Sequence, residues 1–366
     1  MPECKIDTLL DRYRGCMLGG AVGDALGYTV EFMDEGEIRA RYGEGGIAAY
    51  TLVGGTAQIS DDTQMTLFTA DGLLSGAARG LDGDTPEDHA APIAAAYGDW
   101  WRTQNERYPL RGGVTHSRLI HVPALFADRA PGGTCLSALA AYHRGVRGTV
   151  ASPINSSKGC GGVMRVAPIG LFYRDRAVTE VDRIAAEAAA VTHGHDLGYL
   201  PAAGLVHIIH LVTHGGASLS DAVRDMITTV PRLFPGAKHG EDYTALMKKA
   251  VALAEGDTPT VTAIHALGEG WVGEEALAIA VYCALKYEKD FKGAIVAAVN
   301  HNGDSDSTGA ITGNILGACR GLAAIPSPYL DRLELKELLL ELADDLCAAG
   351  HTSDDGAWMP KYKSKI

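Results

Sequence analysis

Two clusters of carboxylates and hydroxyls, one in the N-terminal third of the chain and one in the C-terminal third, carry the side chains best suited to chemistry. The first contains Ser60, Asp61 and Asp62, and the second contains Asp304, Asp306 and Ser307. Each cluster directly precedes a helical run. One Asp or Ser is enough to cap a helix start, and additional adjacent carboxylates repel one another. Oxygen ligands without competing nitrogen or thiolate suit Mg²⁺, Mn²⁺ or Ca²⁺ rather than zinc.

These clusters therefore favour a divalent-cation site, with helix capping as the simpler alternative. Their spacing does not match an EF-hand loop, whose ligands lie within twelve contiguous residues. A third acidic position is formed by Asp24 and Glu31. If one helix carries both, their seven-residue separation places them on one face, directed at the same site. Taken alone, the pair would fit a partly exposed helix end equally well or better.

Helical periodicity dominates the elements that must position these acids. The predicted helices span 7–31, 61–78, 89–105, 134–144, 180–193, 197–214, 218–230, 241–254, 273–287, 291–300, 307–323 and 331–347. Strand patterns are scarce, with one short candidate at 47–52. No linker or low-complexity segment divides the chain, so we expect one all-α domain.

Two of the predicted helices carry a glycine every fourth residue. The ladders are Gly15, Gly19, Gly23 and Gly27 in the first helix, and Gly309, Gly313, Gly317 and Gly321 in the later one. Each glycine inside a helix costs roughly 0.8–1.0 kcal/mol relative to alanine, so eight of them need a compensation. A flat glycine ridge lets a second helix backbone approach closely. We therefore expect both helices to pack tightly in the centre, either against each other or against other helices.

Composition limits the classes of protein and partner. The chain has 366 residues, a formal net charge of −13, and 46% hydrophobic residues, as is typical of a globular protein with a substantial core. The net charge argues against nucleic acid or anionic lipid as a partner. The seven cysteines form no CxxC pair and suggest no disulfide framework. The longest apolar run has ten residues, whereas a membrane span needs about 20. We expect a cytoplasmic protein.

Five blocks of sequence, in order, resemble the ADP-ribosylglycohydrolase family. They are Arg14-Gly15 with Gly23-Asp24-Ala25-Leu26-Gly27 and Glu31-Phe32-Met33; Ser60-Asp61-Asp62-Thr63-Gln64-Met65; Lys158 to Pro168; Thr192-His193-Gly194-His195; and Gly303-Asp304-Ser305-Asp306-Ser307. The resemblance covers about 10–345 of a single domain spanning 1–366. It implies a compact orthogonal helical bundle with two Mg²⁺ or Mn²⁺ ions.

The resemblance also implies roles for individual residues. It makes ligands of Ser60, Asp61, Asp62, Asp304, Asp306 and Ser307. Family members often have Thr where this chain has Ser60 and Ser307, and the hydroxyl is kept in both cases. The opening block looks closest to the dinitrogenase reductase-activating branch, which removes ADP-ribose from arginine.

The glycine-rich segment in the middle of the chain is the implied substrate-binding loop. A run of backbone N–H groups there can form an anion-binding nest, and in this family context we expect it to bind ADP-ribose. The expected substrate-binding residues are Lys158, Gly159, Gly161, Gly162, Met164, Arg165 and His193. His193 resembles a histidine that lines the ribose pocket. Trp100, Trp101 and Trp271 could stack on adenine, but core packing is the better expectation for each.

The expected reaction is metal-dependent cleavage of the ribosyl C1 bond of an ADP-ribosylated acceptor, with arginine on a protein as the first choice. Glu31, Asp62 and Asp304 are the expected catalytic residues, and Asp24 is expected to support the site from behind. The alternatives are hydrolysis of serine-linked or nucleic-acid-linked ADP-ribose, nucleotide phosphohydrolysis at a metal pair, and a non-catalytic ADP-ribose-binding or partner-binding protein. No membrane partner is expected, and nucleic acid enters only as a modified substrate.

Overall fold

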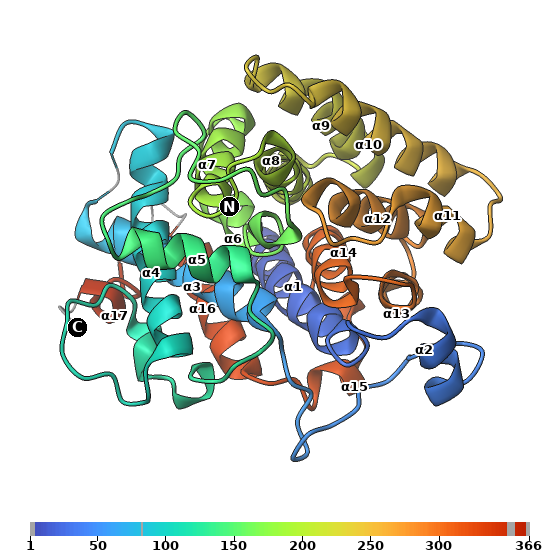
Figure 1. Ribbon diagram of the computed structural model, residues 1–366, viewed down its shortest axis with the longest axis horizontal. Helices are drawn as coiled ribbons and strands as arrows, with labels where there is room; N and C mark the ends of the chain where they lie inside the picture. The colour runs from blue at the N-terminus through green and yellow to red at the C-terminus, as the bar shows by residue number, and fades with distance from the viewer. Residues whose placement is uncertain (1–3, 82, 350–355, 364–366) are drawn as a thin grey trace.

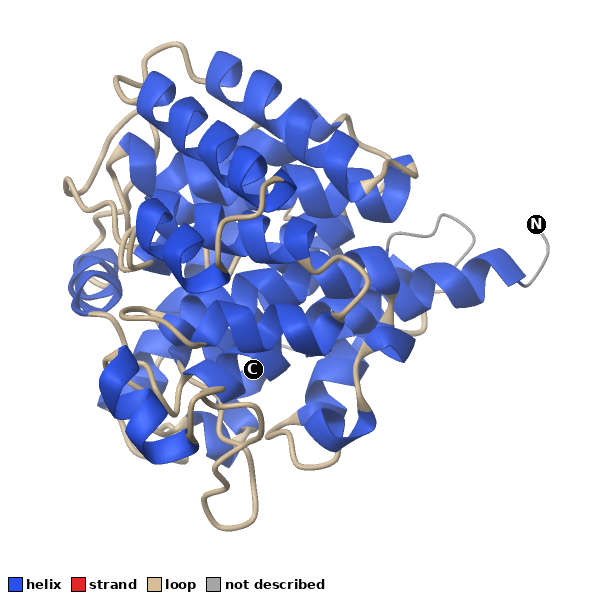
Figure 2. Ribbon diagram, turned by 90° about the vertical axis from the view of Figure 1, so that its right-hand side faces the viewer, coloured by secondary structure: helices blue, strands red, loops and turns tan. Residues whose placement is uncertain are grey.

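The computed structural model describes residues 4–81, 83–349 and 356–363, and within these ranges the protein is all-α, as predicted. Figure 2 shows helices joined by loops, without a sheet. The helices are α1 (Cys4–Gly27), α2 (Glu35–Tyr42), α3 (Asp61–Arg79), α4 (Pro86–Asn105), α5 (Gly133–Tyr142), α6 (Ala167–Phe172), α7 (Val178–Ala190), α8 (Asp196–His210), α9 (Leu219–Leu233), α10 (Gly240–Glu255), α11 (Thr260–Leu267), α12 (Gly273–Lys286), α13 (Phe291–Val299), α14 (Ser305–Arg320), α15 (Ser327–Leu330), α16 (Lys336–Ala349) and α17 (Pro360–Lys363). Single turns lie at η1 (Arg118–His121), η2 (Pro123–Leu125), η3 (Cys160–Gly162), η4 (Leu211–Gly215) and η5 (Leu322–Ala324).

The two glycine-laddered helices, α1 and α14, pack against each other in the centre of the molecule (Figure 1). They run antiparallel, since Gly15 faces Gly317 and Gly23 faces Gly309. A Cβ atom added at Gly19 would lie 2.3 Å from the carbonyl oxygen of Gly313. The backbones therefore touch where any larger residue would hold them apart, and the predicted close packing is confirmed.

The remaining helices surround this central pair in two groups. In Figure 1, α3, α4 and α5 lie on one side of α1, and α9 to α12 lie beyond α14 on the other. Helix α3 is buried from Asp61 to Gly76, because α1, α4, α16 and α17 all pack on it. The α8–η4 segment, Asp196–Gly215, is long and apolar enough to cross a membrane, but 89% of it is buried, as in a core helix.

Three sequence predictions about the elements differ from the structure. Helix α1 ends at Gly27 rather than at residue 31, so Glu31 lies in the turn that follows. The 47–52 segment is irregular rather than a strand. Both backbone polar groups of Ile47 bond to the Asn300 side chain, at 2.7 and 2.9 Å, which replaces a neighbouring strand. The short helices α2, α6, α11, α15 and α17 were not predicted.

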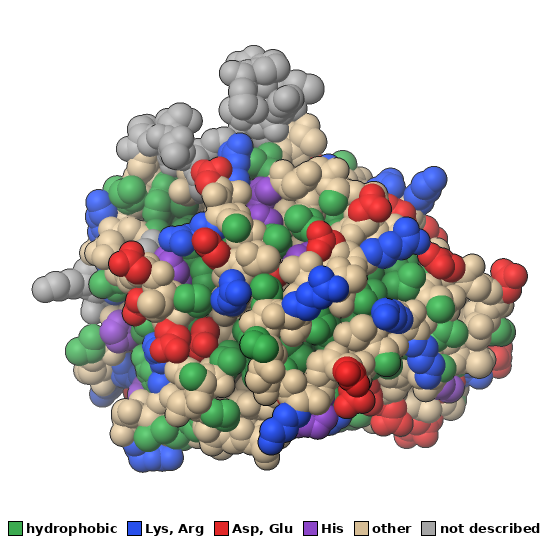
Figure 3. All heavy atoms as spheres, turned by 90° about the horizontal axis from the view of Figure 1, so that it is seen from above, with side chains coloured by type: hydrophobic (Ala, Val, Ile, Leu, Met, Phe, Trp, Pro, Cys, Tyr) green, Lys and Arg blue, Asp and Glu red, His purple; other side chains and the backbone are tan. Residues whose placement is uncertain are grey.

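The acidic excess of the chain is not gathered on the face seen in Figure 3. On this face, acidic and basic side chains alternate with apolar and polar ones. Because no continuous basic surface appears there, the view offers no track for a polyanion.

Candidate functional site

The N-termini of α3 and α14 meet at one cavity, which brings together the two acidic clusters predicted to act as one unit. The described residues that line this cavity are Glu31, Asp61, Asp62, Ala130, Gly132, Gly133, Thr134, Cys135, Gly159, Cys160, Gly161, Met164, His193, Trp271, Asp304, Asp306 and Ser307. The turn after α1 contributes Glu31, and the loop before α12 contributes Trp271. The close contact between α1 and α14 brings the turn that carries Glu31 and the start of α14 to the same cavity.

Asp24 holds the start of α3 in place. Its carboxylate accepts the backbone N–H of Ser60 at 2.9 Å and that of Thr63 at 3.1 Å, together with the Thr63 hydroxyl. The side chain is fully buried, and burial raises its pKa to about 6 despite these bonds. Asp24 is absent from the described cavity lining. Its hydrogen bonds to Ser60 and Thr63 instead position the helix that carries Asp61 and Asp62.

Ser60 and Asp304 serve as N-caps of their helices. The Ser60 hydroxyl accepts the N–H of Asp62 at 3.1 Å, and the Asp304 carboxylate accepts the N–H of Ser307 at 3.2 Å. Ser60 is buried and does not reach the described lining of the cavity. Asp304 therefore both caps its helix and lines the cavity, whereas Ser60 only caps its helix.

The buried acids of the cavity fit divalent cations. The Glu31 Oε2 and Asp62 Oδ2 atoms are buried without a hydrogen-bond partner, which is costly for a carboxylate unless a cation satisfies it. Burial, together with the charges of Asp304 and Asp61, raises the pKa of Glu31 to about 9. Burial and neighbouring carboxylates also raise the pKa of Asp62 and Asp306 well above the ordinary range. Cations would relieve both the desolvation and the repulsion.

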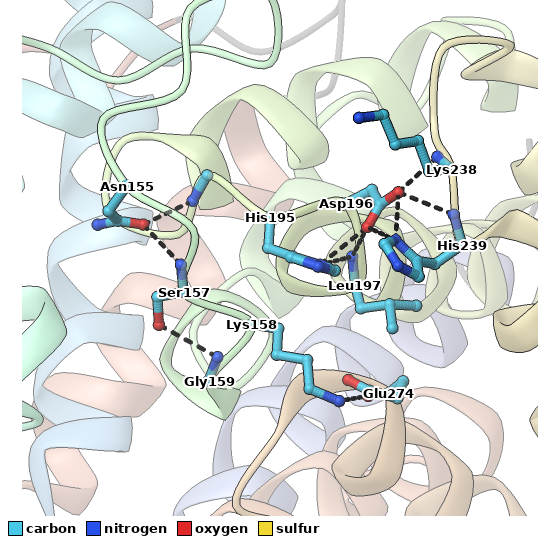
Figure 4. A network of polar contacts seen from close by, with 11 residues as sticks. Asn155, Ser157, Lys158, Gly159, His195, Asp196, Leu197, Lys238, His239 and Glu274 are labelled. Carbon is cyan, nitrogen blue, oxygen red and sulfur yellow. Dashed lines mark hydrogen bonds and ion pairs between the residues drawn. The ribbon is translucent and has the colours of Figure 1, made fainter.

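Four of the residues expected to bind substrate line the cavity: Gly159, Gly161, Met164 and His193. The other three, Lys158, Gly162 and Arg165, are not part of its described lining. The Lys158 ammonium pairs with Glu274, and Figure 4 shows it directed toward α12. Arg165 is fully buried, with its guanidinium 4.3 Å from the Tyr97 ring centre.

Arg165 acts on the site through a chain of hydrogen bonds. It donates to the Thr192 hydroxyl at 2.6 Å, and that hydroxyl lies 2.8 Å from His193 Nδ1. Burial, assisted by the charge of Arg165, lowers the pKa of His193 to about 3, so this imidazole is neutral near pH 7. When Thr192 donates to Nδ1, Nε2 carries the proton and faces the glycine loop, since a Cβ at Gly161 would lie 3.2 Å from it.

The sequence predictions named no site residue at 130–135, although most of this segment lines the cavity. Two further features of the cavity also escaped them. Trp271 lines the cavity and is 40% exposed, so the core packing expected for it is wrong. Its ring stacks on Phe32, which is 73% exposed, with centroids 6.1 Å apart. Trp100, in contrast, is buried and donates to Gln64, and Trp101 donates to the Leu136 carbonyl.

The second missed feature is Cys160, whose thiol lies 2.7 Å from Asp304 Oδ2. Its position inside the glycine-rich motif was the only available signal. The η3 turn (Cys160–Gly162) places this thiol beside the start of α14, where burial and the Asp304 charge raise its pKa well above the ordinary range.

Comparison with known proteins agrees with the all-α fold and identifies the family. The model of the ADP-ribosylglycohydrolase family matches residues 5–356. The ADP-ribosyl-[dinitrogen reductase] glycohydrolase of Rhodospirillum rubrum is 29% identical over 337 residues, covering 89% of this chain and 91% of that protein. The ADP-ribosylarginine hydrolase Tri1 of Pseudomonas putida is 24% identical, covering 93% and 79%. A solved ADP-ribosylglycohydrolase-related protein complex superimposes with a TM-score of 0.62 at 25% identity, covering 94% of this chain and 100% of that chain.

The chain belongs to the ADP-ribosylglycohydrolase family, whose named members above are hydrolases of ADP-ribosyl linkages.

Proposed function

We propose that this protein is a hydrolase that uses two Mg²⁺ or Mn²⁺ ions to release ADP-ribose from ADP-ribosyl-arginine on a protein. The observation that carries the proposal is the convergence of five buried carboxylates on one cavity. They are Glu31, Asp61, Asp62, Asp304 and Asp306. Without cations, burial favours the protonated form of these carboxyls; divalent cations would take the place of those protons and stabilise the ionised carboxylates near neutral pH.

The residues divide into ligands and groups that act on substrate. Asp61, Asp62, Asp304 and Asp306 would hold the cations, with the Ser307 hydroxyl as an additional oxygen ligand. When bound, such ions polarise substrate oxygens and lower the pKa of water. Glu31 is attached to a turn rather than to a helix. Its unpartnered Oε2 atom is the group that would orient the attacking water and exchange a proton with it.

The loop opposite the carboxylates supports binding of ADP-ribose. Gly159 and Gly161 leave space beside the neutral His193 ring, because Cβ atoms there would lie 3.3 and 3.2 Å from its Nε2. A neutral donor suits a ribose hydroxyl, and it adds no positive charge that would compete with the cations. Lys158 is held by Glu274, so the diphosphate would rely on backbone N–H groups and cations instead.

The aromatic pair Phe32 and Trp271 supports arginine as the acceptor. Both rings are exposed, and Phe32 directly follows Glu31, so the pair lies at the mouth of the cavity beside the expected reacting bond. A planar guanidinium stacks favourably on an aromatic face, whereas a serine linkage offers neither a plane nor a charge. The name of the Pseudomonas relative, an ADP-ribosylarginine hydrolase, supports the same acceptor.

The decisive experiment measures turnover of two defined peptides, one carrying ADP-ribosyl-arginine and one carrying ADP-ribosyl-serine. We expect release of free ADP-ribose from the arginine peptide at the higher kcat/KM, loss of activity in EDTA, and recovery with Mg²⁺ or Mn²⁺. Release of inorganic phosphate instead of ADP-ribose would replace the proposal with a phosphohydrolase. Preference for the serine peptide would overturn the acceptor assignment, and full activity in metal-free protein would overturn the metal assignment.

A further inference from the structure

Two imidazoles and a carboxylate meet on the surface at the start of α8, outside the carboxylate cavity. His195 immediately precedes α8, Asp196 is its first residue, and His239 immediately precedes α10. The Nδ1 atoms of both histidines lie 2.8 Å from Asp196 Oδ1. The two rings are 4.7 Å apart between centroids. Figure 4 shows the three side chains converging on one point.

Backbone amides fix the orientation of the Asp196 carboxylate. Its Oδ2 atom accepts the N–H of Lys238 at 2.6 Å and that of His239 at 2.9 Å. The side chain is only 9% exposed. The other oxygen, Oδ1, faces both imidazoles. This is the arrangement of a metal-ligating carboxylate, in which one oxygen ligates while hydrogen bonds to the other hold it in place.

His195 and Asp196 direct lone pairs at each other, which is unfavourable. His195 Nδ1 accepts the N–H of Leu197 at 3.0 Å as the N-cap of α8, so this nitrogen presents a lone pair. The same nitrogen lies 2.8 Å from Asp196 Oδ1, which also presents lone pairs. A cation between them removes this repulsion, and the N–H of Leu197 then keeps Asp196 Oδ1, at 2.9 Å, as its acceptor.

From this geometry we propose that His195, Asp196 and His239 form a site for one transition-metal ion that prefers imidazole, such as Zn²⁺, separate from the carboxylate cavity. Zinc binds nitrogen and carboxylate oxygen at about 2.0–2.2 Å in tetrahedral geometry, which requires ligand atoms about 3.3–3.6 Å apart. The observed 2.8 Å separations must therefore widen by roughly half an ångström or slightly more, which small rotations of the side chains supply. The imidazole ligands also distinguish this site from the cavity, whose carboxylate oxygens suit harder ions.

The ion would tie the end of the α9–α10 connection to a segment that lines the cavity. The backbone N–H of His195 donates to the backbone carbonyl of Ser157 at 3.2 Å. The Ser157 hydroxyl in turn accepts the N–H of Gly159, which lines the cavity. Figure 4 shows this segment directly beside the three ligands. The site therefore stabilises the junction between the substrate loop and α10.

The test is a titration of the full-length, untagged protein with Zn²⁺ by calorimetry, and with Co²⁺ by visible absorption, in excess Mg²⁺ to fill the cavity. We expect one site per chain and a rise in Tm upon Zn²⁺ addition. The variants His195→Asn and His239→Asn should each weaken Zn²⁺ binding by at least tenfold. Asn is a strong N-cap, so the first variant keeps a side-chain acceptor at the start of α8.

Two controls keep the outcome interpretable. His265→Asn removes an exposed histidine that pairs with Glu35 and has no second imidazole beside it, so this variant should bind Zn²⁺ like the wild type. Asp304→Asn alters the cavity and should also keep the Zn²⁺ site. Equal Zn²⁺ binding by the wild type and both His195 and His239 variants, or loss of the site in Asp304→Asn, would overturn the proposal.

Discussion

Replacing Gly313 with alanine should separate the two central helices. A Cβ atom at this position would lie 1.9 Å from the Gly19 carbonyl oxygen, 2.4 Å from the Gly19 carbonyl carbon and 3.0 Å from the Gly20 nitrogen. The closest of these distances is about 1.5 Å short of an ordinary van der Waals contact. All three atoms belong to the backbone, so no side chain can rotate to make room. Either α1 or α14 must move.

The magnitude follows from two opposing contributions. Overpacking a core costs typically 1–3 kcal/mol and occasionally more. Alanine regains roughly 0.8–1.0 kcal/mol of helix propensity relative to glycine. Because the clash is backbone against backbone, we expect the cost to exceed the usual range, leaving a net loss of about 3 kcal/mol. Displacement of α14 should also weaken Mg²⁺ binding, because Asp304 and Asp306 sit at its first turn.

The assay is urea unfolding of both proteins in EDTA and in Mg²⁺, followed by far-UV circular dichroism. Gly240→Ala is the matched control, since its Cβ would meet only Pro231, at an ordinary 3.7 Å. That variant should change the free energy of unfolding by less than about 0.5 kcal/mol. If Gly313→Ala proves as stable as Gly240→Ala, the close approach of α1 and α14 does not determine stability, and our account of the ladders is wrong.

Further predictions concern the cavity. Asp61→Asn and Asp304→Asn should each abolish turnover, and the double variant should be scarcely worse, since residues that act as a unit are non-additive; multiplying defects in kcat would indicate two independent helix caps. Glu31→Gln should lower kcat while leaving the calorimetric affinity for ADP-ribose nearly unchanged, and an unimpaired variant would remove Glu31 from the mechanism. In the folded, metal-free protein the pKa of Glu31 is raised from 4.5 to about 9, so folding favours its protonated form. This contribution to the free energy of unfolding is fully present below pH 4.5 and is lost as the pH rises through 9. Thermal melts should therefore show Mg²⁺ stabilising the protein more at pH 8 than at pH 5, and an equal effect at both would contradict this assignment. Trp271→Ala should raise KM for the arginine peptide more than for the serine peptide, and equal effects on both peptides would exclude stacking on the guanidinium.

The parts of the site that could be predicted from sequence are those that depend on residue types at neighbouring or regularly spaced positions. Asp61 and Asp304 stand at helix starts among more acids than a cap needs, and the structure brings both to one cavity. The glycine ladders likewise indicated close packing, because glycine has no Cβ and permits the closest approach of two helix backbones.

The parts that could not be predicted depend on partners distant in sequence. Lys158 forms an ion pair with Glu274, which directs it away from the cavity, and no local sequence pattern predicts this pairing. Arg165 is covered by Tyr97, and Trp271 stacks on Phe32, a partner that is distant in the sequence. The helical periodicity also predicted that the first helix continues to residue 31, whereas it ends at Gly27. A Cβ there would lie 2.2 Å from the Ser305 carbonyl oxygen, and this contact marks where the helix end meets α14.

The antiparallel pairing of α1 with α14 has a consequence for how the protein is made. Helix α1 ends at Gly27, whereas its partner is complete only at Arg320. At typical synthesis rates of 5–20 residues per second, the ribosome needs roughly 15–60 s to produce the intervening chain. During that interval, the glycine face of α1 has no partner, and Asp61 and Asp62 lack Asp304, with which they would form the proposed cation site. The nascent chain is therefore expected to depend on holding chaperones, and metal capture should be one of the last events of its maturation.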